Sequence, residues 1–275
     1  MNKSELISFL TEIGASPRKS LSQNFLIDPA IISKLTSLAD VVPSDWVLEI
    51  GPGAGAITQE ILKRGAHVYA VEKDLLFAEH LERMQTEDRR LRVDCGDILE
   101  FRVEKLLRLS PKWKVISNLP YQITAPILEV LCNHAHMFES ATLIVQKELG
   151  ERIFAKPKTK MMGALTIFVQ FYAELGKSFG ISANCFYPKP GVDSMAFRID
   201  FKHGAPPVDP KVFFPVVRRA FQQRRKMLTS SLKELVPNLR DVLEKVGIDR
   251  KARPEELGLD EWVSVVREKI IGRTF

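Results

Sequence analysis

The sequence predicts an α/β protein whose main domain contains a mostly parallel, doubly wound β-sheet, followed by a small all-helical domain. Short β-prone apolar runs alternate with helical stretches between residues 46 and 145. Such alternation is typical of βαβ units. A proline-rich break at 203–210 then precedes several short amphipathic helices. Because such breaks favour linkers, we expect two domains, residues 1–202 and 203–275.

Five runs are expected to be strands of the parallel sheet: 46–50, 67–71, 91–93, 114–117 and 141–145. Helical patterns follow the first two, at 57–62 and in a charged stretch ending near Met84. Residues 194–201 alternate apolar and polar side chains. This pattern predicts a half-exposed antiparallel strand at the edge of the sheet.

The composition excludes several classes of protein. Of the 275 residues, 45% are hydrophobic and 27% are charged, as in globular rather than disordered chains. No apolar run approaches the ~20 residues needed to cross a bilayer, and Glu5 and Glu12 make the first apolar stretch unlike a signal peptide. The three cysteines lie far apart, so we expect neither a disulfide framework nor a metal site, and a cytoplasmic location.

The excess positive charge lies at the end of the chain. Residues 1–201 hold 24 Lys and Arg against 24 Asp and Glu, whereas residues 202–275 hold 16 against 10. The expected helices there are 211–223, 226–236, 239–246 and 260–270. A basic appendage often contacts nucleic acid or membranes, but a solvated lysine-rich tail has the same charge, so motifs must decide.

A glycine-rich turn, Gly51-Pro52-Gly53-Ala54-Gly55, directly follows the strand 46–50 and opens a helix. Glycines allow such a turn to approach a ligand closely. Glu72 ends the second strand, where a carboxylate can accept hydrogen bonds from ribose hydroxyls, and Asp97 follows the third, where it can accept the adenine amino group. Together these positions predict a site for an adenosine-containing cofactor.

A dinucleotide-dependent dehydrogenase also fits these positions. Its usual glycine fingerprint has a glycine at the sixth position, which the G-x-G-x-G spacing at Gly51–Gly55 lacks. The loop after the fourth strand also carries a motif that a dehydrogenase does not need.

That loop reads Asn118-Leu119-Pro120-Tyr121. An exocyclic base amine is a poor nucleophile because its lone pair is delocalised into the ring. Methylating it requires acceptors for its N–H groups, which the Asn118 side-chain oxygen and the Leu119 carbonyl can provide. Pro120 stiffens the turn, and Tyr121 offers a face for stacking. An ordinary strand-to-helix turn with a buried tyrosine is the structural alternative.

With these motifs, the sequence resembles the ribosomal RNA adenine N6,N6-dimethyltransferases over nearly the whole chain, most closely the enzymes of the small-subunit (16S) rRNA. The motifs that carry the resemblance are Lys19–Leu26, Glu49–Gly55, Asn118–Tyr121, Phe186–Ser194 and Phe221–Leu228. Their combination is highly specific.

The resemblance implies a Rossmann-like fold of the S-adenosylmethionine-dependent methyltransferases, with S-adenosyl-L-methionine as cofactor. By position, the cofactor contacts would be Asn24, Leu26, Gly51, Gly53, Glu72, Asp97 and Asn118. Phe186 would stack on the target adenine opposite Tyr121. The implied reaction dimethylates two adjacent adenosines near the 3′ end of the small-subunit rRNA. The expected partner is immature small ribosomal subunits, and the expected state is a monomer.

Two positions depart from the family pattern: Ser22, where glycine is more common, and Gly191, where a larger and often basic residue is expected. Between them lies the Phe186 segment, in which Pro188 and Pro190 fix φ and hold an extended loop rigid. A rigid loop can present Phe186 as the second wall of a base pocket. The alternative is a phenylalanine of the core.

A basic cluster of five charges in nine residues follows in the helical domain. It consists of Arg218, Arg219, Arg224, Arg225 and Lys226. On a helix these charges cannot all be paired internally, which favours contact with RNA phosphates. A second basic loop carries Lys156, Lys158 and Lys160. For this loop, phosphate contact and mobile surface lysines remain open alternatives.

Two other functions share parts of this pattern. One is a large-subunit rRNA methyltransferase of the antibiotic-resistance type, and the other is a non-catalytic RNA-binding relative. The string Phe221–Leu228 and the helical C-terminal domain favour the small-subunit enzyme. The intact Asn118–Tyr121 motif argues against a loss of activity.

Overall fold

The computed structural model describes residues 1–18, 21–236 and 238–271. The chain forms two compact units. The first comprises Met1–Gly150 and Glu174–Lys202, and the second comprises Glu151–Ala173 and His203–Phe275. One boundary coincides with the predicted break after residue 202, but Glu151–Ala173 lies with the second unit although the sequence-based division placed it in the first domain.

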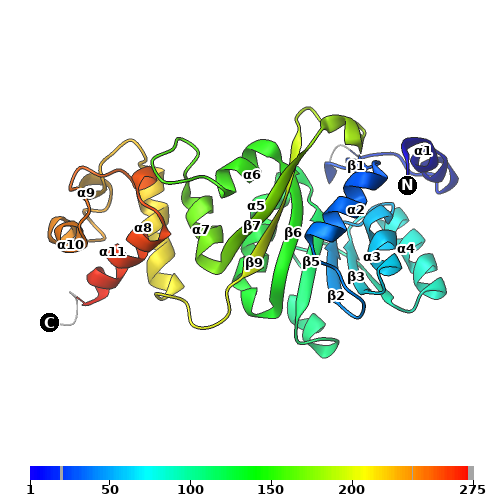
Figure 1. The fold of residues 1–275 in the computed structure, drawn as a ribbon, viewed down its shortest axis with the longest axis horizontal. Helices are drawn as coiled ribbons and strands as arrows, with labels where there is room; N and C mark the ends of the chain where they lie inside the picture. Colours follow the sequence, from blue (N-terminus) through cyan, green and yellow to red (C-terminus); the bar gives the residue numbers. More distant parts are fainter. Residues whose placement is uncertain (19–20, 237, 272–275) are drawn as a thin grey trace. The chain divides into compact units, whose positions relative to one another are not determined.

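The first unit contains a seven-stranded sheet in the order β4-β3-β2-β5-β6-β9-β7 (Figure 1). Its strands are β2 (Trp46–Ile50), β3 (His67–Glu72), β4 (Leu91–Cys95), β5 (Trp113–Asn118), β6 (Phe138–Gln146), β7 (Ala173–Ile181) and β9 (Ser194–Phe201). Strands β4, β3, β2, β5 and β6 are parallel to their neighbours in this series. The predicted α/β class and its five parallel strands are therefore confirmed.

Strand β9 pairs antiparallel with β6, as predicted, but its predicted place at the edge was wrong. Strand β7 lies beyond it and forms the edge. A Cβ atom at Gly176 of β7 would lie 3.0 Å from the Arg198 carbonyl oxygen of β9, which shows how closely the two strands approach. Strand β7 contains two glycines and a burial pattern without regular alternation, so the sequence shows no apolar alternation by which to recognise it.

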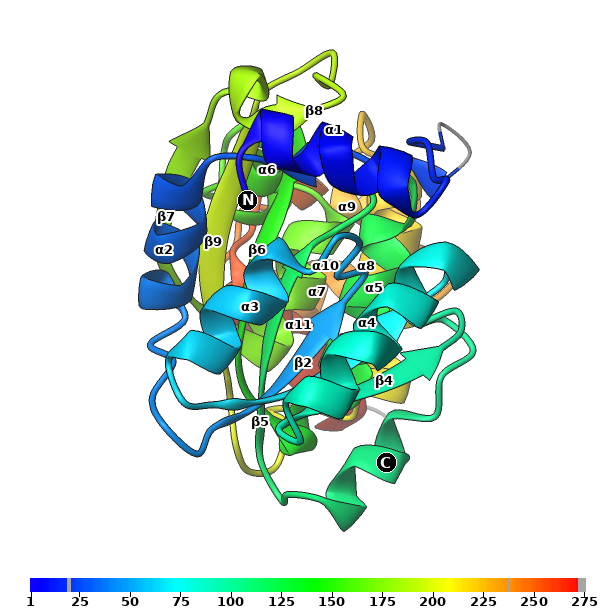
Figure 2. The ribbon, with the colours of Figure 1, turned by 90° about the vertical axis from the view of Figure 1, so that its right-hand side faces the viewer.

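Helices of the first unit cover the sheet with their apolar faces. They are α1 (Lys3–Glu12), α2 (Pro29–Leu38), α3 (Ala56–Lys63), α4 (Leu75–Glu87) and α5 (Thr124–Asn133), with α6 (Lys147–Ile153) beginning in this unit. Figure 2 shows α2, α3 and α4 next to one another in front of the sheet. Ile61 of α3 packs in one buried cluster with Val47 of β2 and Ile116 of β5, so the core fixes the strand ends that carry the glycine turn.

The N-terminal segment is joined to the Phe186 segment by a second, two-stranded sheet. Strand β1 (Phe25–Leu26) pairs antiparallel with β8 (Phe186–Tyr187). Helix α1 is capped by Asn2 and packs Leu6 and Leu10 against Ala54 of the glycine turn and Phe77 of α4. These contacts hold residues 21–26 beside the carboxyl ends of the parallel strands.

The second unit is helical, with α7 (Ala164–Tyr172), α8 (Pro210–Gln222), α9 (Leu228–Ser231), α10 (Leu239–Lys245) and α11 (Leu259–Ile271). Phe171 of α7 packs against Phe213 and Phe214 of α8, which explains why residues 151–173 belong to this unit. Helix α9 is shorter than the predicted helix 226–236. Beyond Ser231 the chain forms tight turns, in which the N–H groups of Leu235 and Val236 both donate to the Leu232 carbonyl.

Short 3-10 turns complete the two units: η2 (Val103–Arg108), η3 (Tyr121–Ile123), η4 (Ala135–Met137), η5 (Ala183–Cys185) and η6 (Pro254–Glu256). In the ranges that the structure describes, no helix combines the length and the apolar character that a membrane crossing requires.

Candidate cofactor pocket and catalytic loop

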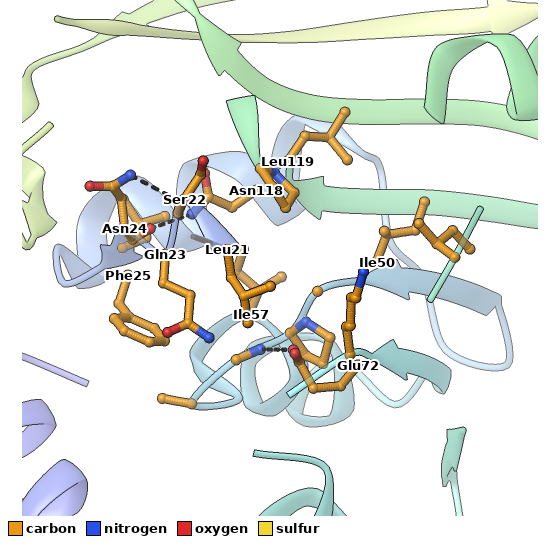
Figure 3. Close-up of a pocket in the computed structure, with 18 of the residues that line it drawn as sticks. Leu21, Ser22, Gln23, Asn24, Phe25, Ile50, Ile57, Glu72, Asn118 and Leu119 are labelled. Atoms are coloured by element: carbon orange, nitrogen blue, oxygen red, sulfur yellow. Dashed lines mark hydrogen bonds between the residues drawn. The ribbon is translucent and has the colours of Figure 1, made fainter. Parts of the chain in front are cut away.

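A cavity lies in the first unit where β2, β3 and β5 end (Figure 3). Because these strands are parallel, their carboxyl ends meet at one edge of the sheet, which is where open α/β sheets bind ligands. The structure brings together in the cavity lining all the residues predicted to contact the cofactor: Asn24, Leu26, Gly51, Gly53, Glu72, Asp97 and Asn118. Leu119, Pro120 and Tyr121 of the predicted catalytic loop also line it.

The glycine turn leaves its backbone accessible at one position and closely covered at another. Gly51 has φ +64°, and a Cβ atom there would meet no atom within 4 Å, so a side chain would occupy open space of the cavity. Gly53 has φ +54°, and its Cβ atom would lie 2.9 Å from the Phe25 ring. Both backbone conformations favour glycine, and a ligand can approach the chain at Gly51.

Glu72 holds the glycine turn as well as facing the cavity. The residue is 5% exposed, and its carboxylate accepts hydrogen bonds from the backbone N–H groups of Gly53 (2.9 Å) and Asp74 (2.8 Å). Burial raises the pKa of Glu72, and these backbone hydrogen bonds partly oppose that shift. Each carboxylate oxygen has two acceptor sites, so Glu72 keeps the capacity to accept ribose hydroxyls.

Asp97 is a second acidic acceptor in the lining of the cavity. Its Oδ2 pairs with the Lys73 ammonium at 2.8 Å, and its Oδ1 accepts the backbone N–H of Leu99. The hydrogen bond from Lys73 is the main reason that the pKa of Asp97 lies below its usual value. Lys73 also lines the cavity, although no role was predicted for it from the sequence.

The amide of Asn118 has a fixed orientation. Its Nδ2 donates to the backbone carbonyl of Asn24 at 2.8 Å, which leaves Oδ1 as the acceptor (Figure 3). The Asn24 side chain donates in turn to the Ser22 carbonyl at 3.0 Å. Asn24 therefore orients Asn118 in addition to lining the cavity.

The rest of the loop is tied to neighbouring strands. The Ser117 hydroxyl donates to the Ile50 carbonyl at 2.6 Å, and the Leu119 N–H donates to the Ile144 carbonyl at 3.1 Å. The Tyr121 hydroxyl hydrogen-bonds the fully buried Ser194 Oγ at 2.7 Å. Ser117 and Ser194 were not predicted as supports, although Ser194 lies within the motif Phe186–Ser194.

The N-terminal motif is fastened to the same site through Asp74. Its buried carboxylate accepts from Gln23 Nε2 at 3.1 Å and lies 3.5 Å from the Arg18 guanidinium. The backbone of Arg18 donates to Gln23 Oε1 at 2.8 Å. Lys19 and Ser20, which belong to the quoted motif, lie outside the described residues.

Phe186 occupies a different environment from the other predicted site residues. The residue is 2% exposed and belongs to an apolar cluster, and its backbone pairs with Leu26 across β1 and β8. In the described part of the chain it is not among the residues that line the cavity with Tyr121. The stacking role of Phe186 stays a prediction, and its position here is that of a core phenylalanine.

A buried acid lies on β2, the strand that leads into the glycine turn. Glu49 of β2 is 1% exposed, and its Oε2 accepts the Thr58 hydroxyl at 2.6 Å. Burial, with a smaller contribution from the nearby Glu72 charge, raises the pKa of Glu49 to about 8. The neutral acid is therefore the predominant form near neutral pH.

The predicted RNA-binding residues lie in the second unit, and their surroundings differ. Arg218, Arg225 and Lys226 are exposed. Arg219 forms an ion pair with Glu234 at 3.2 Å. Arg224 donates from Nη2 to the Lys160 carbonyl at 2.6 Å, so part of its guanidinium is used within the protein.

Comparison with known protein families gives an independent view of this arrangement. The family model described as "Ribosomal RNA adenine dimethylase" matches residues 14–270. A relative from Protochlamydia amoebophila, named "Ribosomal RNA small subunit methyltransferase A", is 45% identical over 96% of this chain and 95% of its own length. A protein of the same name from Chlamydia trachomatis serovar L2 is 38% identical over 95% of both chains.

Solved structures have the same fold. A dimethyladenosine transferase from Plasmodium falciparum aligns with a TM-score of 0.78 at 24% identity, covering 89% of this chain and 96% of its own. The 23S rRNA methyltransferase ErmE aligns with a TM-score of 0.69 at 23% identity, covering 90% and 100%. The resemblance found in the motifs is confirmed by the family match and the near full-length relatives, and the chain belongs to the ribosomal RNA adenine dimethylase family.

Proposed function

We propose that this enzyme transfers methyl groups from S-adenosyl-L-methionine to the N6 amines of two adjacent adenosines near the 3′ end of small-subunit rRNA. The observation that carries the proposal is the Asn118 amide at the edge of an adenosine-type cavity. Because its nitrogen is bound to Asn24, its oxygen is available to accept a substrate N–H.

The residues of the cavity fit the proposed cofactor. Gly51 leaves open space beside the backbone, Glu72 offers acceptors to a ribose, and Asp97 offers an ionised acceptor to an adenine amino group. When bound, S-adenosyl-L-methionine supplies an electrophilic methyl group.

The residues of the loop address the low nucleophilicity of the adenine amine. Asn118 Oδ1 and the Leu119 carbonyl accept its N–H groups and stabilise the positive charge that develops on nitrogen during methyl transfer. The Tyr121 ring supports the extruded base by stacking, as aromatic side chains commonly do in enzymes that act on flipped bases. Pro120 sets the start of the turn that places Tyr121.

The small-subunit assignment is supported by two relatives named as small-subunit rRNA methyltransferases, which are 38% and 45% identical to this chain over nearly their full length. The large-subunit alternative shares the catalytic loop, and the solved structure of such an enzyme has a similar fold at 23% identity. The complete Asn118–Tyr121 loop argues against the non-catalytic alternative. We further propose immature small subunits as the substrate, a monomeric enzyme and a cytoplasmic location, which agree with an rRNA target.

The test is methyl transfer to immature small ribosomal subunits that lack this modification, followed by mass spectrometry of the RNA nucleosides. The expected product is N6,N6-dimethyladenosine at two adjacent positions near the 3′ end. Product found only in large-subunit rRNA, or no product on any rRNA, would contradict the proposal. Asn118→Ala serves as the inactive control.

A further inference from the structure

Most hydrogen-bond donors among the side chains of the cavity are already used within the protein. The lining residues with a polar side chain are Ser22, Gln23, Asn24, Glu72, Lys73, Asp97, Asn118, Tyr121 and Gln122. The donors with a partner inside the chain are Gln23 with Asp74, Asn24 with the Ser22 carbonyl, Lys73 with Asp97, Asn118 with the Asn24 carbonyl (Figure 3), and Tyr121 with Ser194.

Two side chains of the lining differ from these. Among the residues that the structure describes, the Gln122 amide and the Ser22 hydroxyl have no hydrogen-bond partner. Gln122 is exposed, whereas Ser22 is partly buried. The Gln122 amide combines two N–H donors with an acceptor oxygen at the end of a long side chain. It is therefore free to bind a substrate group.

The backbone beneath Gln122 is held in place. Gln122 is the central residue of the turn η3, in which the Ile123 N–H donates to the Pro120 carbonyl at 3.2 Å. The buried Thr124 hydroxyl donates to the same carbonyl at 3.2 Å. The residue before Gln122 is Tyr121, whose hydroxyl is bound to Ser194. The turn thus presents the Gln122 side chain from a fixed position directly beside the ring proposed to stack on the base.

The proposed substrate base needs a donor that the rest of the loop does not supply. In the proposed mechanism, Asn118 Oδ1 and the Leu119 carbonyl accept the N–H groups of the adenine amine. Adenine also has an acceptor nitrogen on either side of that amine, N1 and N7. An enclosed acceptor without a partner costs free energy. The Asn118 nitrogen is engaged by Asn24, so a donor for the ring has to come from another residue.

We propose that Gln122 is a substrate-binding residue whose Nε2 donates to the ring nitrogen beside the amine of the target adenine, N1 or N7. The inference rests on the proposed methylation of adenosines. Side-chain amides bind adenine at its amine edge in nucleic-acid recognition, which is the chemistry required here. The Ser22 hydroxyl, on a side chain of a single carbon in the N-terminal segment, is the competing donor.

The first test compares Gln122→Met, which removes the amide, with Gln122→Glu, which replaces the donor by an acceptor. Gln122→Met should lower kcat/KM for small-subunit rRNA by about 5-fold, the equivalent of ~1 kcal/mol for a neutral hydrogen bond, and Gln122→Glu by at least as much. Affinity for S-adenosyl-L-methionine, measured by calorimetry, should stay at its wild-type value. Gln59→Met, on α3 and outside the cavity lining, is the matched control and should keep kcat/KM. Wild-type kcat/KM in Gln122→Met would overturn the proposal.

The second test changes the base instead of the enzyme. Small subunits are reconstituted with a ligated 3′ rRNA segment in which 1-deazaadenosine or 7-deazaadenosine replaces the two target adenosines, so that a C–H group replaces N1 or N7. On the analogue that lacks the bound nitrogen, wild type and Gln122→Met should react at equal rates, because neither pair can form the bond. The other analogue should keep the 5-fold difference, which identifies the nitrogen. A merely structural role of Gln122 would leave the difference on both analogues and would overturn the proposal.

The remaining outcomes separate this inference from its competitors. If the loss caused by Ser22→Ala, and not that of Gln122→Met, disappears on one analogue, Ser22 is the donor and the proposal fails. If the wild type methylates small-subunit rRNA but the Gln122→Met loss is the same on all three bases, the proposed function stands and the inference fails. If the wild type modifies only large-subunit rRNA, the proposed function fails, and the same comparison on that RNA decides the role of Gln122. Methylation of no RNA would overturn both.

Discussion

The hydrogen bond between Tyr121 and Ser194 fixes the ring that the proposed mechanism uses for stacking, and a double-mutant cycle can measure its contribution. Tyr121→Phe keeps the ring but leaves the completely buried Ser194 hydroxyl without this partner. An unsatisfied buried polar group costs about 1–3 kcal/mol in the free energy of unfolding. Ser194→Ala leaves the half-buried Tyr121 hydroxyl without this partner. Because water can partly reach that hydroxyl, we expect the loss in the free energy of unfolding to lie at the lower end of this range.

The double variant removes both partners, so its loss of stability should be smaller than the sum of the single losses, by about 1 kcal/mol. If the same bond orients the ring for methyl transfer, each single variant should lower kcat by about 5-fold, the equivalent of ~1 kcal/mol. The assays are urea unfolding and methyl incorporation at saturating cofactor. Tyr69→Phe, on β3 and outside the cavity lining, is the control and should keep kcat. Wild-type kcat in both single variants would refute the positioning role.

Three further predictions address the pocket. Because burial raises the pKa of Glu49 to about 8, the folded chain keeps a proton that the unfolded chain releases above about pH 4.5. The free energy of unfolding of the wild-type protein should therefore fall as pH rises from 4.5 to 8, by up to about 5 kcal/mol more than that of Glu49→Gln. If the free energies of unfolding of the two proteins depend on pH in the same way, the prediction is wrong. Glu72→Gln should weaken binding of S-adenosyl-L-methionine by about 1–3 kcal/mol in calorimetry, and unchanged affinity would remove Glu72 from the site. Ser22→Gly should raise the unfolding temperature, because φ at Ser22 is +50°, and a lower temperature would contradict the strain argument.

The sequence predicted those parts of the fold that depend on continuous apolar runs. The parallel strands and the glycine turn were found because their residues are buried on both faces, as at Val47 and Leu48. Strand β7 was missed because its stability comes from pairing with β9, and the pattern around Gly176 shows no alternation. The assignment of residues 151–173 to the second unit was not predicted, because it depends on the contact of Phe171 with Phe213, which lies far away in the sequence.

The site was predictable where one residue type performs one chemical task. Glu72 and Asp97 were predicted from their positions at the ends of strands, and Asn118 was predicted from its motif; all three line the cavity. The residues that hold these side chains in place could not be predicted, because they lie far away in the sequence and no motif spacing connects them. Ser194 holds Tyr121, and Arg224, whose contact with phosphate stays a prediction, donates to the Lys160 carbonyl.

In the proposed mechanism, the Asn118 amide supports methyl transfer to the adenine amine, whereas most contacts with the cofactor come from other residues of the pocket. The most direct measurement is single-turnover methyl transfer by Asn118→Ala, with cofactor affinity determined in parallel by calorimetry. Asn118→Ala should still bind S-adenosyl-L-methionine, with affinity lowered by no more than the roughly 1–3 kcal/mol of a lost hydrogen bond, while methylation of small-subunit rRNA is lost. Methyl transfer at a rate near that of the wild-type enzyme would contradict it.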